Sequence, residues 1–575
     1  MGFMSRRQLS LASLLATVAA LIVGACGGGS SNTPAPVATA TKAPVAATAT
    51  PIPAPTAVPT PTAVPVKRGG TLKLRITMDP QPWNVLQGPV TTSFPVFLPV
   101  LSTLVQLDRD AGKITPDLAQ SWSTSGDGKT ITFKLRPGVT WHDGAPLKAA
   151  DVKVNLDAVF FKTLGFTSHL QGFFTAADST AAPDDSTVVV TLKQPSNSFF
   201  QHFTHPMFAN YAPQVSQTDL ATGKVVGSNA YTWTNWQKGV QITERAYPKY
   251  NVNGVDGKAL PYMDELDWFI IPDSTADLAA FRTGKLDVFD QLDAAALTGH
   301  LDELSGSIPG LSIAGKSYDS WRMVIVKNRP PFDNVLVRQA LNIGIDRQAF
   351  VDAALSGAGV AHGYALVAKD LGGLWAPSSA DLQKLPGMNP ATRQQDLAQA
   401  SALLKQAGYD ENRPLKATMY VVASGVFPTE ATVALAGLNA IKGLKIDLVP
   451  EESAKHNQRL VLNGDFDLIY RPFALTVDDP SDTIGLFWTS TASRNYSGWN
   501  DPTIDQLFNE EETTTDANLR AQDISKLLVR VYDQAYNVFL AWGSTSYIGR
   551  PDVKGVPGGG SYANHWRYDK AWLNR

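Results

Sequence analysis

The sequence has little cysteine: one residue, Cys26, in 575. A chain with a single cysteine forms no internal disulfide, and beyond Cys26 it offers no thiol nucleophile and no thiolate ligand for a metal. The fold therefore depends on core packing alone. No G-x-S-x-G motif of a serine hydrolase is present, and the eight histidines are scattered. His202 and His205 are three residues apart, but no further ligands follow them at metal-site spacing, so we predict no metal and no cofactor.

The sequence also lacks a strong charge of one sign. Lysine and arginine number 49 and aspartate and glutamate 52, which gives a net charge of -3. This balance provides no basic field for nucleic acid, so we exclude a nucleic-acid partner. Long hydrophobic runs are equally scarce, because only Leu9–Val23 is extended and apolar. About 500 residues after that run exceed what one hydrophobic core holds, and two or three domains are expected.

The N-terminus has the pattern of an export signal. Arg6 and Arg7 precede the apolar run, and two small residues, Gly24 and Ala25, precede Cys26. This arrangement resembles the bacterial lipobox, which implies cleavage before Cys26 and a diacylglycerol on its sulfur. We therefore predict a signal peptide over 1–25 and a lipidated Cys26 that tethers the protein to the outer face of the cytoplasmic membrane. A structural cysteine behind an ordinary signal is the alternative. The export route, general or twin-arginine, stays open.

A low-complexity stretch follows the cysteine. Gly27–Val66 consists mainly of Gly, Ser, Ala, Thr, Val and Pro, with repeats such as Pro59–Thr62. It cannot bury a core, and its prolines favour an extended chain that reaches on the order of 100 Å. We predict that 26–66 is a spacer between the lipid anchor and the folded body.

The remaining chain mixes strand and helix patterns. Thr71–Thr77 and Lys129–Arg136 alternate apolar and polar residues as half-buried strands do, and Gly126–Gly128 reads as a hairpin turn. Hairpins dominate before about residue 260, and strands alternate with helices after it, which indicates mixed α/β lobes. Further strands are expected at Val188–Leu192, Asp264–Pro272, Trp321–Val326, Lys445–Val449 and Leu468–Phe473, and helices at Ser274–Thr283, Val337–Ala354, Asp396–Gln406 and Arg520–Tyr532.

One segment matches a nucleotide-binding pattern. Gly310–Ser317 (GLSIAGKS) fits the phosphate loop G-x-x-x-x-G-K-S, which requires a buried strand before it and a helix that begins at Lys-Ser. Turn residues precede the segment, and Trp321–Val326 after it reads as a strand. We interpret the match as coincidence.

Several segments form a collinear set of motifs. The densest is Ile114–Trp122 (ITPDLAQSW) followed by Phe133–Gly144 (FKLRPGVTWHDG), and Val226–Trp236, Phe281–Val288 and Arg329–Arg347 continue the set. In this order they resemble the solute-binding proteins of the peptide/nickel ABC-transporter family (family 5), and the resemblance covers essentially all of Lys67–Arg575. Each segment also has a structural role: His142 reads as a hydrogen-bonded structural histidine, and Arg338 and Arg347 as solvated or paired charges beside a core stripe.

The resemblance implies an α/β, periplasmic-binding-protein-like clamshell of two lobes with an extra N-terminal lobe. By family order, 67–104, 218–316 and 538–575 build lobe I, 105–217 forms the extra lobe, and 317–537 forms lobe III. The implied function is extracytoplasmic capture of a peptide-like solute and its delivery to the permease subunits of an ABC importer, by closure around the ligand and without catalysis. We expect a monomer.

The resemblance places the ligand beside Asp467–Trp488. Peptide-binding members have an aspartate four residues before a proline, where it pairs with the ligand's ammonium group; the matching residue here is Thr476, and Asp478 is a substitute. The aromatic position three residues earlier is Phe473. Asp479 reads as the N-cap of a helix with Pro480 in its first turn.

Other candidate ligand contacts are Asn84, in a loop after the first strand, and the aromatic residues Trp488, Tyr496 and Trp499. Aromatic rings suit apolar side chains and sugar faces alike, and tryptophan is also a common core residue. The ligand could therefore also be a non-peptide solute such as an oligosaccharide. A different function, a secreted hydrolase on the same scaffold, also stays open.

Overall fold

The computed structural model describes residues 65–80, 93–108, 113–165, 171–215, 219, 224–291, 303–474, 477–556 and 567–575. Val64–Arg575 forms one compact unit. The predicted signal peptide, Cys26 and most of the predicted spacer lie outside the described residues. Within the described residues, no helix has the length and apolar character needed to cross a bilayer.

The first sheet brings the start of the chain beside a distant segment. Strand β1 (Thr71–Ile76) pairs in parallel with β10 (Glu265–Ile270), and the hairpin of β8 (Tyr231–Gln237) and β9 (Gln241–Ala246) continues the sheet in the order β1-β10-β9-β8. Inward residues of β1 such as Leu72 and Leu74 are buried, as the alternating pattern predicts. The strands expected over Thr71–Thr77 and Asp264–Pro272 are confirmed.

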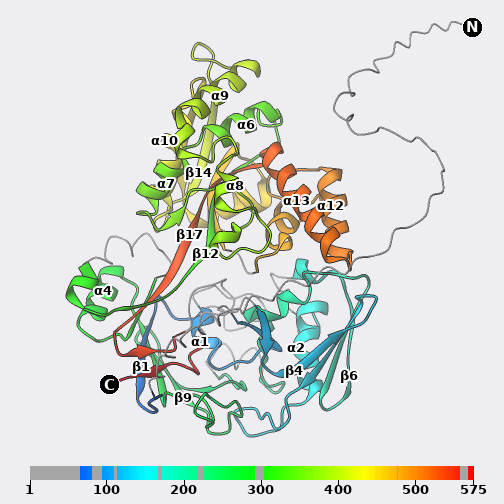
Figure 1. Ribbon diagram of the computed structural model, residues 1–575, viewed down its shortest axis with the longest axis vertical. Coiled ribbons are helices and arrows are strands. Elements are labelled where there is room, and N and C mark those ends of the chain that lie inside the picture. Colours follow the sequence, from blue (N-terminus) through cyan, green and yellow to red (C-terminus); the bar gives the residue numbers. More distant parts are fainter. Residues whose placement is uncertain are drawn as a thin grey trace, which may run out of the picture. The chain divides into compact units, whose positions relative to one another are not determined.

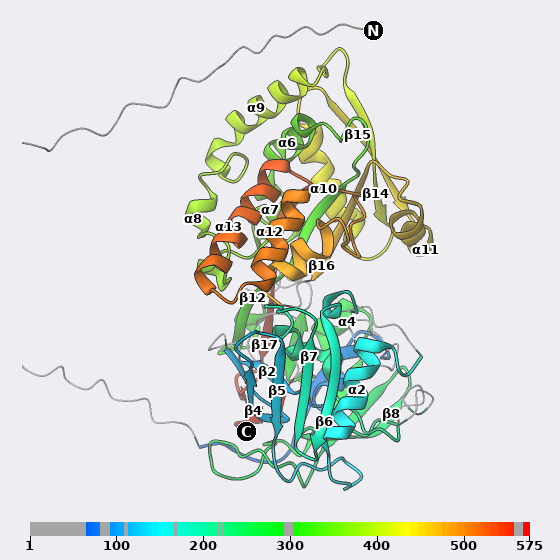
Figure 2. The same ribbon diagram turned by 90° about the vertical axis from the view of Figure 1, so that its right-hand side faces the viewer.

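A second sheet is antiparallel. Its order is β4-β5-β7-β6, from β4 (Ala119–Thr124), β5 (Thr130–Leu135), β6 (Ala177–Asp184) and β7 (Thr187–Leu192). Helix α2 (Ala149–Phe161) packs on this sheet (Figure 2). The predicted hairpin turn is confirmed, since the Ser125 N–H donates to the Thr130 carbonyl at 2.8 Å. Trp141 is fully buried beside this sheet.

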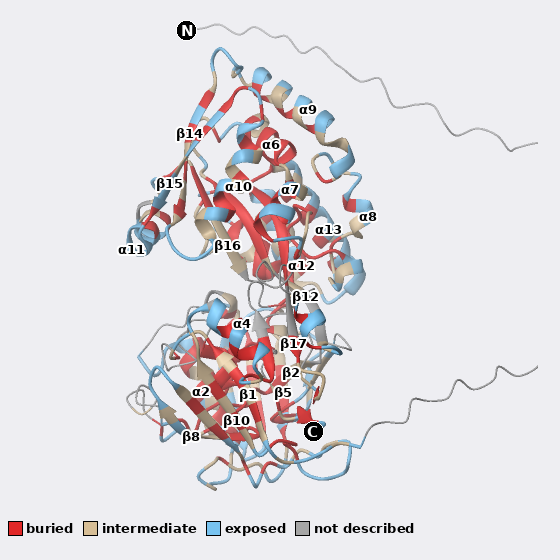
Figure 3. Ribbon diagram, turned by 90° about the vertical axis from the view of Figure 1, so that its left-hand side faces the viewer, coloured by how far each residue is buried: buried red, intermediate tan, exposed pale blue. Residues whose placement is uncertain are grey.

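The third sheet has seven strands and contains the two longest. Its order is β11-β17-β12-β16-β14-β15, with β13 (Gly359–Val360) also on β17. Strand β12 (Ser312–Val326) pairs antiparallel with β17 (Asn537–Gly549) over most of their lengths. Buried strands fill its centre, and exposed residues lie on the outer helices (Figure 3). The other members are β11 (Val288–Gln291), β14 (Leu415–Val422), β15 (Leu444–Glu451) and β16 (Leu468–Ala474).

Strands β12 and β17 pass from one hydrophobic core to another (Figure 1). At one end, Ile548 of β17 packs in a small cluster with Phe281 and Phe289. At the other end, Val538 and Leu540 pack in a larger core. The two long strands therefore connect separately packed regions.

Helices cover the third sheet. Helix α10 (Phe427–Asn439) packs on β14 and β15, and α6 (Val335–Gly344) and α7 (Arg347–Ala354) pack on β17. The other α-helices are α1 (Phe94–Phe97), α4 (Ser274–Arg282), α8 (Ser379–Leu382), α9 (Arg393–Gln406), α11 (Ser453–Asn457), α12 (Pro502–Thr513) and α13 (Ala517–Gln534). Short pairs are formed by β2 (Val105–Asp108) with β3 (Lys113–Pro116) and by β18 (Val553–Lys554) with β19 (Trp572–Leu573).

The single helix predicted over Val337–Ala354 is wrong. The chain forms α6 and α7 instead, because Ile345 and Asp346 have extended backbone and the Asp346 side chain accepts the Ala349 N–H as the N-cap of α7. The apolar periodicity continues across this break, so the hydrophobic pattern alone does not reveal it.

Arg338 and Arg347 are buried rather than solvated, which corrects the expectation for both. Arg338 donates to the backbone carbonyls of Phe332, Asp333 and Gln534. Arg347 donates to three other backbone carbonyls and to the Asn342 side chain. Both guanidinium groups therefore tie loops to helices.

The phosphate-loop match is a coincidence, as predicted. Lys316 and Ser317 lie within strand β12, paired with Ser546 and Thr545 of β17. They do not begin a helix, so the backbone geometry that binds phosphate is absent there.

Candidate ligand-binding site

Strand β16 leads into the segment where the ligand is expected. Its first residues pair with both β12 and β14, but Pro472 lies beyond the β14 pairing and is opposite Arg322 of β12 only. Proline has no N–H to donate, so it fits this one-sided end of the strand. Phe473 follows, half-buried, with its ring 4.7 Å from that of Phe487.

Asp478 lies just after this strand and holds a neighbouring loop. One carboxylate oxygen accepts the Leu374 N–H, and the Asp478 carbonyl accepts the Trp375 indole N–H at 3.1 Å. The other carboxylate oxygen is buried and, among the described residues, has no hydrogen-bond partner. Burial, reinforced by the charges of Asp479 and Asp482, raises the pKa of Asp478 to about 7. Asp478 therefore has one oxygen left to receive a donor.

Asp479 has two roles at the start of the next helical turn. Its Oδ1 accepts the Ser481 N–H at 3.1 Å, which agrees with the predicted cap, and its Oδ2 pairs with Arg520 of α13 at 2.6 Å. The turn itself is a short π-helix over Ser481–Gly485. Asp482 accepts the Val477 N–H at 2.8 Å and so closes the loop between strand and turn.

The three aromatic candidates take part in packing. Trp488 is fully buried, with its ring 5.5 Å from Phe539. Trp499 is also buried, and its indole N–H donates to the Tyr536 carbonyl at 3.1 Å. Tyr496 is half-buried, and its carbonyl accepts from the Lys327 ammonium. Among the sequence candidates in the described residues, Phe473 lies at the end of β16, and Asp478 follows four residues after that strand. Asn84 and Thr476 lie outside the described residues.

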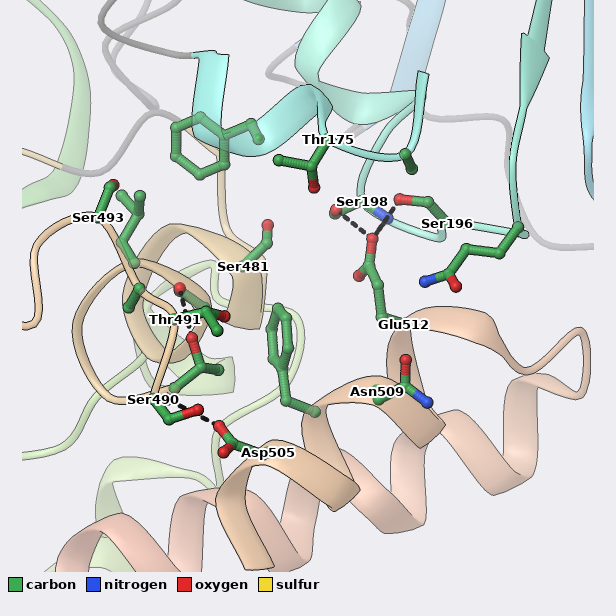
Figure 4. Close-up of a pocket in the computed structure, with 18 residues that line it drawn as sticks. Thr175, Ser196, Ser198, Ser481, Ser490, Thr491, Ser493, Asp505, Asn509 and Glu512 are labelled. Atoms are coloured by element: carbon green, nitrogen blue, oxygen red, sulfur yellow. Dashed lines mark hydrogen bonds between the residues drawn. The ribbon is translucent and has the colours of Figure 1, made fainter. Parts of the chain in front are cut away.

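A pocket of about 600 Å³ lies beside this segment (Figure 4). One wall comes from 173–198 and the other from 481–493 and helix α12. Among the described residues, the lining contains no lysine, arginine or histidine. It contains hydroxyl and amide groups, two carboxyl groups and two phenylalanine rings: Phe173, Thr175, Gln194, Ser196, Ser198, Ser481, Thr489, Ser490, Thr491, Ser493, Asp505, Phe508, Asn509 and Glu512.

The two carboxyl groups of the pocket differ in their contacts. Asp505 accepts the Ser490 N–H at 2.7 Å, within one wall. Glu512 accepts from the hydroxyls of Ser196 and Ser198 and from the Ser198 N–H, across the pocket (Figure 4). Burial and the charge of Asp479 raise the pKa of Glu512. No sequence motif pointed to Glu512; the visible signal was the acidic run Glu510–Glu512 at a helix C-terminus, where the dipole disfavours negative charge.

Three of the described histidines, His142, His202 and His205, take part in packing and backbone hydrogen bonds. His142 donates its Nε2–H to the Asn229 carbonyl at 3.0 Å and accepts the Gly227 N–H at Nδ1, and burial lowers its pKa to about 4. His202 and His205 are buried, and His202 contacts the Ser198 carbonyl at 2.8 Å. Among the described residues, the one group with metal-ligand spacing is Asp479, Glu511 and Glu512, and Arg520 already lies between two of its members.

Comparison with known proteins gives the family. The model of bacterial extracellular solute-binding proteins, family 5, matches residues 113–495. The glutathione-binding protein GsiB of Salmonella typhi is 31% identical over 343 residues, which are 58% of this chain and 60% of GsiB, so the match spans about three fifths of that relative. The dipeptide-binding protein of Escherichia coli K12 is 24% identical over 80% of this chain and 86% of its own.

Solved structures agree on the fold. The periplasmic binding protein DppA of Helicobacter pylori, in complex with the peptide STSA, superposes with a TM-score of 0.72 at 21% identity. The alignment covers 88% of this chain and 99% of DppA. The α/β periplasmic-binding-protein fold expected from the resemblance is therefore confirmed, and the chain belongs to family 5 of the bacterial extracellular solute-binding proteins.

Proposed function

We propose that this protein captures a peptide-like solute outside the cytoplasmic membrane and delivers it to the permease subunits of an ABC importer. The observation that carries the proposal is the pocket between 173–198 and 481–512 in a chain of family 5. A cavity of this volume with convergent polar groups is the usual form of a small-molecule site. The protein binds and releases its solute without chemical change, as a membrane-tethered monomer.

Strands β12 and β17 support a clamshell closure. They form an antiparallel pair that passes between separately packed cores, and their register shifts at Ala314/Lys316 and Tyr318/Ser320. Two long strands with such irregularities can bend while the cores stay rigid. We place the hinge in this pair, between lobe I and lobe III. Lobe I is 67–104, 218–316 and 538–575, the extra lobe is 105–217, and lobe III is 317–537.

The charges of the site favour some solutes over others. The described part of the pocket lining has carboxyl, hydroxyl and amide groups and no basic side chain. Asp478 has one oxygen without a partner among the described residues. A carboxylate can pair with an ammonium group, whereas an anion would find no counter-charge in this lining. We therefore propose a solute that presents an amine or neutral polar groups. Phe473 on β16 and Asp478 after it are its proposed contacts, and Asn84, Thr476, Trp488, Tyr496 and Trp499 are further candidates.

A neutral oligosaccharide is the second candidate. It is favoured by the many hydroxyl groups and by Phe173 and Phe508 in the same lining, since sugars combine hydroxyls with apolar faces. The two candidates differ in their need for Asp478, because only an amine gains a charged pair there.

Native mass spectrometry of protein purified from its own host tests the function. We expect a bound solute of peptide mass that is released intact. We also expect Asp478→Asn to bind this solute at least about tenfold more weakly than wild type does. A sugar mass with unchanged binding in Asp478→Asn favours the second candidate. Conversion of the released solute into products would instead support a hydrolase and contradict the proposal.

The anchor is tested separately. In Cys26→Ser, the protein lacks the sulfur that would carry the lipid, so we expect it to move from the membrane fraction to the soluble fraction. A control variant with Ser30→Ala leaves the cysteine intact and stays with the membrane. Retention of Cys26→Ser in the membrane would contradict lipidation.

A further inference from the structure

One wall of the pocket is tied to the other at the end of helix α12. The last carbonyls of a helix have no partner within the helix. Here Asn197, from the opposite wall, supplies it: its side-chain amide donates to the carbonyls of Glu511 at 2.6 Å and Thr514 at 2.9 Å. The Asn197 N–H donates to the Glu512 carbonyl at 2.8 Å. The segment 196–198 therefore caps a helix to which it is not joined in sequence.

Carboxylates complete this contact. Glu512 Oε1 accepts the Ser198 hydroxyl at 2.5 Å, the Ser198 N–H at 3.2 Å and the Ser196 hydroxyl. Farther along the same segment, the Gln201 amide lies 3.3 Å from Asp479 Oδ2. We call these interactions between 196–201 and Asp479, Glu511 and Glu512 the α12 contact.

The α12 contact contains more negative than positive charge. Asp479, Glu511 and Glu512 each have an oxygen within 4.8 Å of the others. Among the described residues, their only ion-pair partner is Arg520, at 2.6 Å from Asp479 and 3.1 Å from Glu511. The surrounding groups do not correct this balance, because Asp478 and Asp482 flank Asp479 in sequence, and His202, at 3.6 Å, faces Asp482. One guanidinium group, paired with two of the carboxylates, is therefore the only described positive charge that forms an ion pair in a cluster of three carboxylates.

Two of these carboxylates also have a free oxygen in the part of the chain that the structure describes. Glu511 is fully buried, and its Oε1 has no hydrogen-bond partner. The Oε2 atom of Glu512 is also buried without a hydrogen-bond partner. A buried carboxylate oxygen without a donor, next to like charge, is costly. A single bound proton removes one charge and turns one of these acceptors into a donor.

We propose that the α12 contact is a proton-dependent latch across the pocket. It holds while the three carboxylates share a proton, and it loosens when all three are ionised. The inference that the latch regulates solute capture rests on the proposed function. The pH dependence of the α12 contact itself does not depend on that function.

The direction of the pH dependence follows from the environment. In the closed contact, burial and neighbouring carboxylates raise the pKa of Glu511 and Glu512. Once the contact opens, Glu512 meets water and its pKa returns towards the ordinary value near 4.3. Closing of the contact therefore takes up a proton. The contact weakens as pH rises from the ordinary glutamate pKa towards the raised pKa of the closed contact.

Hydrogen exchange of the full-length protein at about pH 6 and about pH 9, corrected for intrinsic rates, tests the latch. Asn197 and Ser198 both donate their N–H groups across the contact, so their peptide reports it. We expect its protection to fall at least about tenfold between the two pH values. In Glu512→Gln, which keeps an acceptor for both serines without a charge, we expect less than about a twofold change.

Control variants distinguish the latch from a general effect of pH on the fold. Glu510→Gln makes the same change at an exposed neighbour and keeps the wild-type pH dependence. Equal pH dependence in wild type and Glu512→Gln overturns the proposal, and Glu511→Gln repeats the test if Glu512→Gln does not fold. Protection at pH 9 that about 1 mM Ca²⁺ restores and EDTA removes also overturns it, in favour of a cation site. Solute binding is measured in a separate experiment. If no solute binds, the proposed function fails, but the hydrogen-exchange result still tests the pH dependence of the α12 contact.

Discussion

Single buried polar residues decide how this site is built. Asp478 keeps a loop in place with one oxygen, and Glu512 reaches across the pocket with one oxygen. In each case the second oxygen is buried without a partner among the described residues. Such groups bias the protonation of the site, and they are the residues at which small changes have large effects.

Asp478→Asn should change how stability depends on pH. Because the pKa of Asp478 is raised to about 7, the native state binds this proton more tightly than the unfolded chain, and stability falls as pH rises from about 4 to 7. Asparagine removes that loss. Relative to wild type, the variant should gain about 1–2 kcal/mol in unfolding free energy between pH 5 and pH 8, measured by urea denaturation. The same substitution at exposed Asp352 should show no such gain, and a difference independent of pH would contradict the raised pKa.

Gly227→Ala should be severely destabilising. A Cβ at Gly227 would lie 2.0 Å from the Val100 carbonyl oxygen, which is backbone and cannot move aside. We expect a loss of about 4 kcal/mol or more, seen as a lowered melting temperature or insoluble protein. Gly126→Ala is the control, since nothing lies within 4 Å of that position. Comparable melting temperatures for the two variants would show that the close approach is not real.

At this scale the candidate contacts from the sequence remain predictions. Phe473 and Asp478 were predicted because they match or neighbour the positions that the family resemblance places beside the ligand. Glu512 was not, because its importance comes from Ser196 and Ser198, more than 300 residues earlier in the chain. The burial of Trp488 was equally invisible, since tryptophan has the same sequence signature in a core and at a ligand.

Secondary-structure elements were predicted well where the pattern was local. The strands β1, β5 and β10 and the helices α4, α9 and α13 all coincide with expected segments, since alternation and helical spacing are local properties. The break between α6 and α7 was missed because its causes are polar and tertiary. Asp346 caps α7, and Gly344 packs where a Cβ would lie 2.5 Å from Ile441 and 2.8 Å from Ala400.

Asp346→Ala tests the cause of this break. The variant loses the N-cap bond to the Ala349 N–H and the ion pair with Arg393 at 3.1 Å. We expect a loss of about 1–2 kcal/mol in unfolding free energy, measured by chemical denaturation. Asp352→Ala removes an exposed acid from the same helix and should cost less than about 0.5 kcal/mol. If both substitutions cost the same, the cap does not stabilise the break.

Across the whole molecule, buried histidines oppose the buried acids in their response to pH. Burial lowers the pKa of His142 and His362 to about 4 and that of His205 to about 3. Each is neutral in the native state and takes up a proton in the unfolded chain below about pH 6.5, so stability falls on acidification. Asp478 and Glu511 act in the other direction as pH rises. The two sets together confine maximal stability to an intermediate pH.

His142→Gln should reduce the acid sensitivity. Glutamine can still donate to the Asn229 carbonyl, but it does not titrate. Between pH 7 and pH 5 we expect the variant to lose about 1 kcal/mol less unfolding free energy than wild type, measured by urea denaturation at each pH. An unchanged difference between the two pH values would mean that His142 is not a neutral buried residue.

The first core contains residues from both ends of the described chain. Leu72 of β1 shares it with Tyr568 and Trp572, and the Tyr262 N–H donates to the Asp569 carbonyl. A chain still emerging from the ribosome therefore lacks the last side chains of its first core. Part of the cover of β1 and β10 is therefore missing until Tyr568 and Trp572 have been synthesised, and the apolar surface left open in the meantime is prone to aggregation.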